Sequence, residues 1–278
     1  MSNLRDQLVQ DGFVRIPSAL PQDQLEALRA ACQDVTQLAR AGDSDTSKGI
    51  WGVQHLMHPD LPHHNTFAAS YFAPYIINAV TEILQCSPSD LVLELYNLLI
   101  RPDADFALRW HRDDIGPEVS AQEELNRLQE PMLHAQWNLA LYPDRSLVVV
   151  PGSHVRSRTE EERSADPFEE NLPGQMVVEM NAGDIIFYNN NILHRGVYSS
   201  EAERMTLHGS MGIVGADPAR ARNVLQHGVG AWVDRCDFSR LQDQVNDQQL
   251  STLAQDMRSR LVTMGSGQVL SFSQPFNE

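Results

Sequence analysis

Hydrophobic positions change their spacing near residue 90, which separates a helical first part of the chain from a strand-rich middle. Within residues 21–40, Leu25 and Leu28 belong to an apolar stripe that repeats at helical spacing. A second helix is predicted for about 69–85, where apolar side chains again recur every three or four positions. We expect both helices to pack against a sheet that the following residues form.

From Leu91 onward the chain consists of short apolar runs separated by Pro, Asp, Gly and Asn, a pattern typical of strands joined by turns. These runs are LVLELYNLLIRP, FALRWHRD, HAQWNLALY, SLVVVPGSH, GQMVVEMNAG, DIIFYNN and RMTLHGSMGIV. They predict a double-sheet jelly roll of the cupin kind, whose barrel can hold a metal. After Gly215 the pattern becomes helical again. The predicted fold class is therefore mainly β with flanking α-helices, around a double-stranded β-helix core.

The length of 278 residues fits one large domain or a domain with an added helical cap. We predict a single domain over 1–278. It comprises a helical N-terminal part at about 1–88, a jelly-roll core at about 89–215 and a helical C-terminal cap at about 216–278. The segment 43–65 is rich in Gly, His and Pro and indicates a long loop, which in compact domains often serves as a lid.

Charge and composition narrow the classes of partner. The net charge is −16, which argues against nonspecific binding to nucleic acid or to an anionic membrane. No stretch approaches the roughly 20 apolar residues that span a bilayer, and the first residues lack the apolar core of a secretory signal. Three widely spaced cysteines predict neither a disulfide framework nor a metal knuckle. We expect a cytoplasmic protein with a small-molecule substrate, and leave open a homodimer joined through the helical ends.

The main candidate for chemistry is an H-x-D motif, formed by His111 and Asp113 in RWHRDDIG. In a strand, residues i and i+2 point to the same face, so both side chains can bind one ion while Arg112 points away. His194 can complete the facial triad that binds Fe(II) in non-heme oxygenases and leaves the opposite face open. Arg204 follows ten residues later and offers a planar fork suited to a carboxylate. A metal triad with a carboxylate anchor suggests a 2-oxoglutarate oxygenase.

Taken alone, H-x-D is a weak signal, because 10 histidines and 37 acidic residues make such pairs common by chance. The alternative interpretation is a structural polar cluster that contains a buried salt bridge. The preceding strand, the second histidine and the later arginine together favour the metal site.

Three longer motifs agree with that interpretation. They are the opening DGFVRIPSALPQDQLEAL, the PGSH turn after SLVVV, and AGDIIFYNNNILHRG, which delivers the distal histidine. In these motifs the chain resembles the phytanoyl-CoA dioxygenase family of Fe(II)- and 2-oxoglutarate-dependent oxygenases, from about Asp11 to Gly212. The resemblance implies that Fe(II), 2-oxoglutarate and O2 oxidise a small organic molecule, with a secondary metabolite among the candidates. Succinate and CO2 would be released.

The resemblance also implies roles for individual residues of the barrel. Arg204 would bind the distal carboxylate of 2-oxoglutarate, and Thr206, on the same face by alternation, is a candidate to help hold it. Arg109 is expected to face the interior, where it would bind the other carboxylate of 2-oxoglutarate, an anionic substrate group or an internal acid. Asn97 and Gln136 lie on apolar strands, and an inward-facing amide needs hydrogen-bond partners. Each amide is a candidate to line the cofactor site.

The substrate pocket is expected to include Trp51, Gln54 and His55, because a loop before the barrel commonly covers its mouth in this family. Coenzyme A dependence stays open: the acidic balance speaks against it, whereas three nearby arginines in the RSRTEEERS segment could bind phosphates.

Two other classes of function remain as alternatives. One is a non-catalytic, cupin-like protein that binds a metal or small molecule, and the other is a cupin dioxygenase that uses three histidines. Asp113 and Arg204 both speak against the second alternative. Asp113 also favours oxygenation over halogenation, because family relatives that halogenate carry a small residue at that position.

Overall fold

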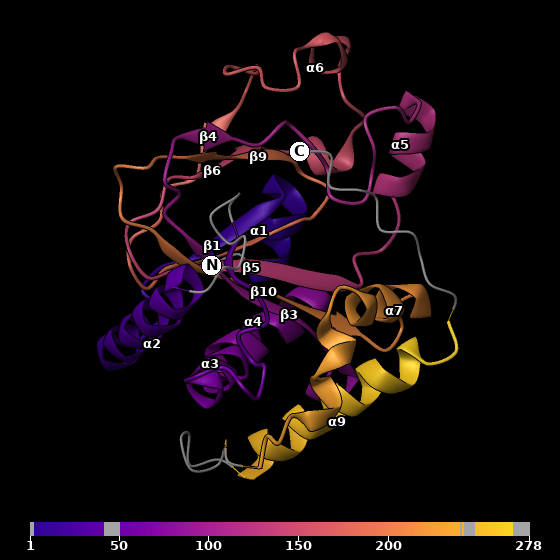
Figure 1. The fold of residues 1–278 in the computed structure, drawn as a ribbon. Coiled ribbons are helices and arrows are strands. Elements are labelled where there is room, and N and C mark those ends of the chain that lie inside the picture. Colours follow the sequence, from indigo (N-terminus) through magenta and orange to yellow (C-terminus); the bar gives the residue numbers. More distant parts are fainter. Residues whose placement is uncertain (1–2, 42–50, 240, 242–247, 269–278) are drawn as a thin grey trace.

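The computed structural model describes residues 3–41, 51–239, 241 and 248–268 (Figure 1). The chain begins with helix α1 (Leu4–Asp11), strand β1 (Phe13–Ile16) and helix α2 (Gln22–Ala41). The predicted first helix is confirmed: Leu25 and Leu28 are buried on one face of α2.

The predicted second helix is instead two helices, α3 (His64–Tyr71) and α4 (Pro74–Leu84). The break falls at Pro74, which occupies the first turn of α4 and has no backbone N–H to continue α3. Within the described residues no single helix is long and apolar enough to cross a membrane, although the bent α3–α4 pair passes that test on length and composition.

Two antiparallel sheets form the core of the molecule. The larger has the order β1-β8-β5-β10-β3-β2, and the smaller has the order β4-β9-β6-β7. The remaining strands are β2 (Trp51–Val53), β3 (Leu91–Ile100), β4 (Phe106–Ala107), β5 (His134–Ala140), β6 (Leu147–Val150), β7 (Met176–Val177), β8 (Ile185–Tyr188), β9 (Leu193–Tyr198) and β10 (Met205–Ile213). This arrangement confirms the predicted mainly β fold with a double-stranded β-helix core.

The larger sheet has two differently packed faces. Trp137 and Phe187 point outward into the main hydrophobic cluster, which the helices below the sheet in Figure 1 help to form. Ala140 and Ile186 point inward and pack with Val149 of the smaller sheet in a second cluster between the sheets. Strand alternation therefore assigns the intervening polar side chains of β5 and β10 to the barrel interior.

The regions outside the barrel are helical. Helices α5 (Ala121–Leu128) and α6 (Glu160–Ser164) lie on the side of the smaller sheet. On the opposite side, α7 (Pro218–Gln226) packs against α9 (Gln248–Gly265), which also contacts β3. Three short 3-10 turns, at Ser153–Val155, Val229–Ala231 and Val233–Arg235, join these elements.

Candidate metal centre and carboxylate pocket

His111, Asp113 and His194 come together at one end of the barrel. Their ligand atoms all lie within 4.8 Å of one another, close enough to bind a single ion. Oδ1 of Asp113 lies 3.4 Å from Nε2 of His111 and 3.6 Å from Nε2 of His194. An antiparallel bridge joins the two histidines, with His111 N–H donating to the carbonyl of His194 (3.0 Å) and the reverse bond at 3.1 Å. The backbone therefore fixes the two imidazoles side by side.

The second nitrogen of each imidazole is already occupied by the chain. Nδ1 of His111 donates to the carbonyl of Arg109, and Nδ1 of His194 donates to the carbonyl of Ile192, both at 2.8 Å. A proton held on Nδ1 leaves the lone pair of Nε2 for a metal, and such contacts commonly orient histidine ligands. Both Nε2 atoms face Asp113, so the three donors converge on one point.

The charges of the triad affect one another. Burial raises the pKa of Asp113, but the neighbouring His194 and His111 outweigh it and hold that pKa below its usual value. Burial, followed by the charge of His111, lowers the pKa of His194 to about 4. Asp113 is thus a carboxylate and His194 a neutral imidazole near pH 7, which are the forms that bind metals.

The carboxylate of Asp113 has a further contact. Nε2 of Gln136 donates to its Oδ2 at 3.0 Å, which orients the acid from the inner face of β5. Asp113 N–H also donates to the carbonyl of Asn190 at 2.9 Å, which ties the H-x-D segment to the segment that precedes His194. The side chain of Asp113 remains 33% exposed, so the metal position is accessible.

A second charged site lies deeper in the barrel, around Arg204. The Arg204 Nε donates to Oδ2 of Asp144 at 3.0 Å, and its guanidinium lies 4.7 Å from the ring centroid of Tyr198. The same carboxylate oxygen accepts a 2.5 Å hydrogen bond from Thr206. Nη1 of Arg204 is buried and has no hydrogen-bond partner among the described residues. A buried guanidinium N–H without a partner is costly, which indicates a place for an external acceptor such as a carboxylate.

Tyr188 lies between the two charged sites. Its ring centroid is 5.5 Å from that of His194. Burial, and then the charges of Asp113 and Tyr198, raise its pKa well above the usual value, whereas Arg204 lowers it. A neutral phenol therefore stands near both the metal end and the Arg204 end.

Of the other residues predicted for the cofactor site, Asn97 and Thr206 are buried and Arg109 is exposed. Asn97 is buried, and its Oδ1 accepts a 2.8 Å hydrogen bond from the backbone N–H of His55. Thr206 is fully buried, with its hydroxyl bound to Asp144. Arg109 is exposed, and its role in binding a carboxylate stays a prediction. The strand before the H-x-D motif ends at Ala107, so alternation does not extend to this position.

The predicted substrate residues lie on or just after β2, which pairs with β3 at the edge of the larger sheet. Gln54 is exposed, and the side chain of Trp51 lies outside the described residues. His55 packs against Trp232, with ring centroids 5.6 Å apart, and so connects β3 to the C-terminal helical layer. Their role in substrate binding stays a prediction.

The arginines considered for coenzyme A are engaged elsewhere. Arg158 and Arg163 bind the buried Glu124, and Arg156 forms a two-bond pair with Glu162. These contacts leave the RSRTEEERS segment without a phosphate-binding arrangement of free guanidinium groups.

Sequence reasoning missed two residues that the structure brings to the site, Asp144 and Tyr188. Asp144 stands in a Pro-Asp turn, where an acid is common for local reasons. Its pairing with Arg204 spans 60 positions, and no local pattern reveals a contact of that kind.

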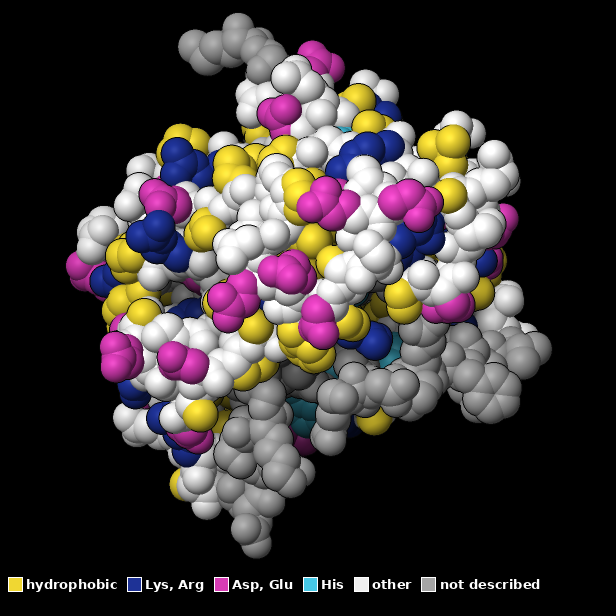
Figure 2. Space-filling model, turned by 90° about the horizontal axis from the view of Figure 1, so that it is seen from above, with side chains coloured by type: hydrophobic (Ala, Val, Ile, Leu, Met, Phe, Trp, Pro, Cys, Tyr) yellow, Lys and Arg dark blue, Asp and Glu magenta, His cyan; other side chains and the backbone are white. Residues whose placement is uncertain are grey.

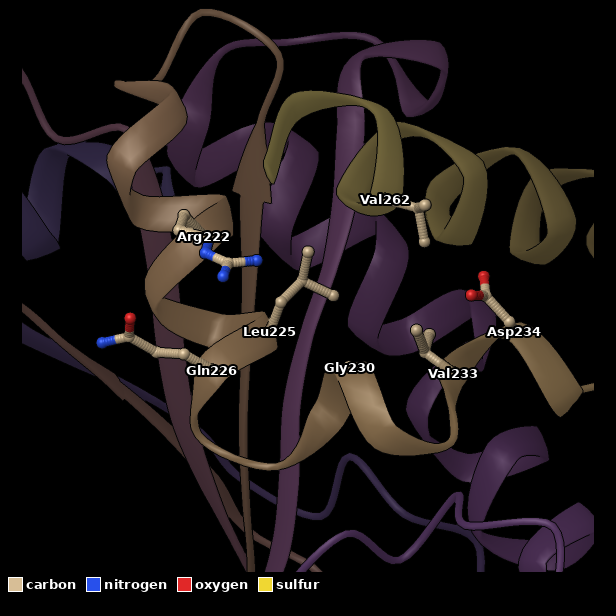
Figure 3. Close-up of a pocket in the computed structure, with 7 residues that line it drawn as sticks. All are labelled: Arg222, Leu225, Gln226, Gly230, Val233, Asp234 and Val262. Atoms are coloured by element: carbon tan, nitrogen blue, oxygen red, sulfur yellow. The ribbon is translucent and has the colours of Figure 1, made fainter. Parts of the chain in front are cut away.

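A cavity of about 440 Å³ lies away from the triad, between α7, the 3-10 turns and α9 (Figure 3). Its lining is mixed, with Leu225, Val233 and Val262 beside Arg222 and Asp234. None of the residues predicted for the metal or cofactor lines it.

Comparison with known proteins gives one family and many similar folds. The profile described as "Phytanoyl-CoA dioxygenase (PhyH)" matches residues 8–206. HygX from Streptomyces hygroscopicus, solved with nickel and 2-oxoglutarate, has 18% identity and a TM-score of 0.56, covering 76% of this chain and 86% of its own. EctD from S. alaskensis, solved with 2-oxoglutarate and 5-hydroxyectoine, has 16% identity and a TM-score of 0.54, covering 76% and 75%. SnoN, an α-ketoglutarate-dependent epimerase from nogalamycin biosynthesis, has 18% identity and a TM-score of 0.54, covering 76% and 82%. No curated protein sequence matches the chain.

Proposed function

Because the chain belongs to the phytanoyl-CoA dioxygenase family, we propose that it is an Fe(II)- and 2-oxoglutarate-dependent dioxygenase that hydroxylates a small organic molecule and releases succinate and CO2. One observation carries the proposal. The inner wall of the barrel combines three convergent metal donors with a buried arginine whose Nη1 has no partner among the described residues.

The donor set fits Fe(II). Two imidazole nitrogens and one carboxylate suit this ion, and three protein donors leave coordination positions for 2-oxoglutarate and O2. The chain holds His111 and His194 with Nε2 toward the site, and Gln136 orients Asp113. When bound, the iron supplies the oxygen activation, so the chain needs to provide binding, orientation and exclusion of water.

The Arg204 end fits the distal carboxylate of 2-oxoglutarate. The positive charge of Arg204 is balanced by Asp144 through Nε, which leaves Nη1 for an incoming oxygen. Thr206 holds the same Asp144 oxygen, so the guanidinium is fixed in orientation before the cosubstrate binds. A preset, buried donor favours binding, because little ordering remains to be done.

The proposal of a small substrate rests on charge. The net charge is −16, and acidic and basic side chains are interspersed over the face in Figure 2 rather than gathered by sign. Such a surface does not favour a polyanionic substrate. The engagement of Arg156, Arg158 and Arg163 by glutamates also speaks against a coenzyme A thioester.

The first test is an anaerobic titration of the Fe(II)-loaded protein with 2-oxoglutarate. We expect a weak visible metal-to-ligand charge-transfer band in the wild type. In Arg204→Ala, the band should need far more 2-oxoglutarate. Iron that is demonstrably bound without any such band would contradict the proposal and favour a non-catalytic cupin-like binding protein.

The second test concerns turnover. Succinate formation, measured with candidate small molecules, should rise when the correct substrate is present, and mass spectrometry of that molecule should show one added oxygen. A product that lacks two hydrogens, or that differs only in configuration, would keep the cofactor assignment and contradict hydroxylation.

A further inference from the structure

Arg112, the residue between the two ligands of the H-x-D motif, points away from the triad into a buried ionic cluster. Its side chain has no exposed surface, and its Nε donates to Oε1 of Glu124 at 2.7 Å. Nη1 donates to the carbonyls of Ser153, at 3.0 Å, and Asn191, and Nη2 donates to the carbonyl of Arg156 at 3.0 Å. All three nitrogens of the guanidinium are thus used inside the protein.

Glu124 binds three arginines from two segments, the H-x-D segment and the segment around α6. Besides Arg112 it binds Nε of Arg158 at 2.8 Å and Nη2 of Arg163, and it also accepts the backbone N–H of Arg158 at 2.9 Å. Glu124 lies on α5 and is fully buried. Removing four charged groups from water is costly, and such clusters do not by themselves make a protein more stable than apolar packing would.

One acceptor of Arg112, the carbonyl of Asn191, lies on the segment that delivers the other histidine, and a second, Ser153, bonds to that segment. Asn191 stands three residues before His194, and the hydroxyl of Ser153 accepts the N–H of Leu193 at 2.7 Å. One guanidinium therefore ties the H-x-D segment to two places beside His194. These are Asn191, just before strand β9, and Ser153, just after the neighbouring strand β6. Together with the backbone bridge between His111 and His194, these bonds fix the distance between the H-x-D segment and His194.

We propose that Arg112 and Glu124 form a positioning clamp that holds His111 and Asp113 at the correct distance from His194 before the metal binds. The proposal deepens the metal-site assignment and rests on the proposed function. Neither residue touches the metal position: each acts through the backbone that carries the ligands. Partners that orient metal ligands typically change metal affinity about 10- to 100-fold when removed.

The test is titration of the metal-free protein with Co(II) under anaerobic conditions, followed by visible absorption. For Glu124→Gln we expect about 10- to 100-fold weaker binding and an altered ligand-field spectrum. The matched control is Asp184→Asn, another buried carboxylate that accepts two backbone N–H groups, at 2.8 and 2.9 Å, in a different part of the barrel. Both variants should lower the unfolding temperature, but the control should bind Co(II) as the wild type does.

A further variant separates geometry from charge. Arg112→Met removes a positive charge near a dication, so an effect of charge alone would strengthen Co(II) binding. Loss of the clamp would weaken it, and we expect about tenfold weaker binding. Arg112→Lys keeps the charge but cannot reproduce the fork, and should weaken binding by a smaller factor. It provides the test if Glu124→Gln and Arg112→Met do not fold.

The outcomes distinguish the clamp from the metal site itself. If the wild type does not bind Co(II), the proposed function fails. If the wild type binds Co(II) and the folded clamp variants match it within twofold, with an unchanged spectrum, the cluster is only structural and the clamp proposal is overturned. Equal weakening in Asp184→Asn would overturn it as well, because the effect would then follow stability alone.

Discussion

The two ends of the candidate site differ in how their charges are balanced before any ligand binds. At the metal end, Asp113 receives one amide donor, from Gln136, and otherwise faces two imidazoles. At the other end, Asp144 receives Arg204 and Thr206 on one oxygen, and the hydroxyl and N–H of Ser146 on the other, at 2.6 and 2.8 Å. The metal end is therefore arranged for an added cation, whereas the charges at the Arg204 end are already balanced and Nη1 of Arg204 is left as a hydrogen-bond donor.

This difference indicates that one end of the site is suited to a cation and the other to an anion. A cation entering the metal end accepts the lone pairs of the two Nε2 atoms and of Oδ1 of Asp113, which face one another at 3.4 and 3.6 Å. An anion entering the Arg204 end gains a hydrogen bond without having to break the ion pair to Asp144. Substitutions at the metal end should change binding of the ion, and those at the other end should change 2-oxoglutarate binding or folding stability.

The largest effect is expected for Asp113→Asn. The substitution keeps the shape of the side chain but removes the negative charge and one metal donor. Because partners outside the ligand set already change affinity 10- to 100-fold, loss of a ligand should weaken Fe(II) binding by more than about 100-fold. Isothermal titration of the metal-free protein under argon measures this directly. Wild-type affinity in the variant would show that Asp113 is not a ligand.

The next largest effect is expected for removal of the guanidinium at the other end. The paired variant Arg204→Met with Asp144→Asn removes both charges and avoids leaving one of them buried alone. Loss of a charge-assisted contact of about 3 kcal/mol predicts about 100-fold weaker 2-oxoglutarate binding. Fe(II) affinity, measured in parallel, should stay near that of the wild type. A coupled loss of iron binding would contradict the separation of the two ends.

An effect of similar size, on stability rather than ligand binding, is expected for Asp144→Asn alone. Breaking a buried pair by removing one partner should lower the free energy of unfolding by about 3 kcal/mol near pH 7. Burial raises the pKa of Asp144, but Arg204, Ser146 and Thr206 outweigh it and hold the pKa below its ordinary value of 3.8. The stabilisation is therefore present above about pH 4 and is lost as the pH falls through the lower, folded-state pKa.

Urea denaturation at a series of pH values measures this linkage. The difference in unfolding free energy between the wild type and Asp144→Asn should be constant near neutrality and shrink in acid. A difference that grows as the pH falls below 4 would contradict the sign of the pKa shift.

The sequence predicted the parts of the site that repeat at fixed short spacing. His111 and Asp113 come together as predicted, although no regular strand covers them and only His111 forms a bridge, and the barrel follows from repeated apolar runs. Strand β9 was not among the predicted strands, because LHRGVY has only a weak apolar pattern, although the structure buries most of it. The second helix was predicted as one because its apolar positions continue across the break at Pro74.

The parts that could not be predicted depend on distant contacts. Glu124 looks like a surface residue of a polar helix, yet three arginines from residues 112–163 bury it completely. Asp144 likewise looks like a turn residue until the fold brings Arg204 to it. Arg109 lies in the same irregular segment after β4 as His111 and Asp113; its side chain is exposed, and its role in cofactor binding stays a prediction.

The smallest effect is expected for Gln136→Ala. Its amide contacts only Oδ2 of Asp113, whereas Oδ1 faces both imidazoles, so the variant should retain all three metal donors. Loss of one orienting hydrogen bond predicts Fe(II) binding weaker by up to about tenfold, with 2-oxoglutarate binding to Arg204 unchanged. Gln136→Glu serves as the contrasting variant, because a second carboxylate beside Asp113 adds negative charge where a cation binds. If the Ala variant weakens 2-oxoglutarate binding more than iron binding, Gln136 acts on the cosubstrate directly, and the two ends of the site are less separate than their charge balance indicates.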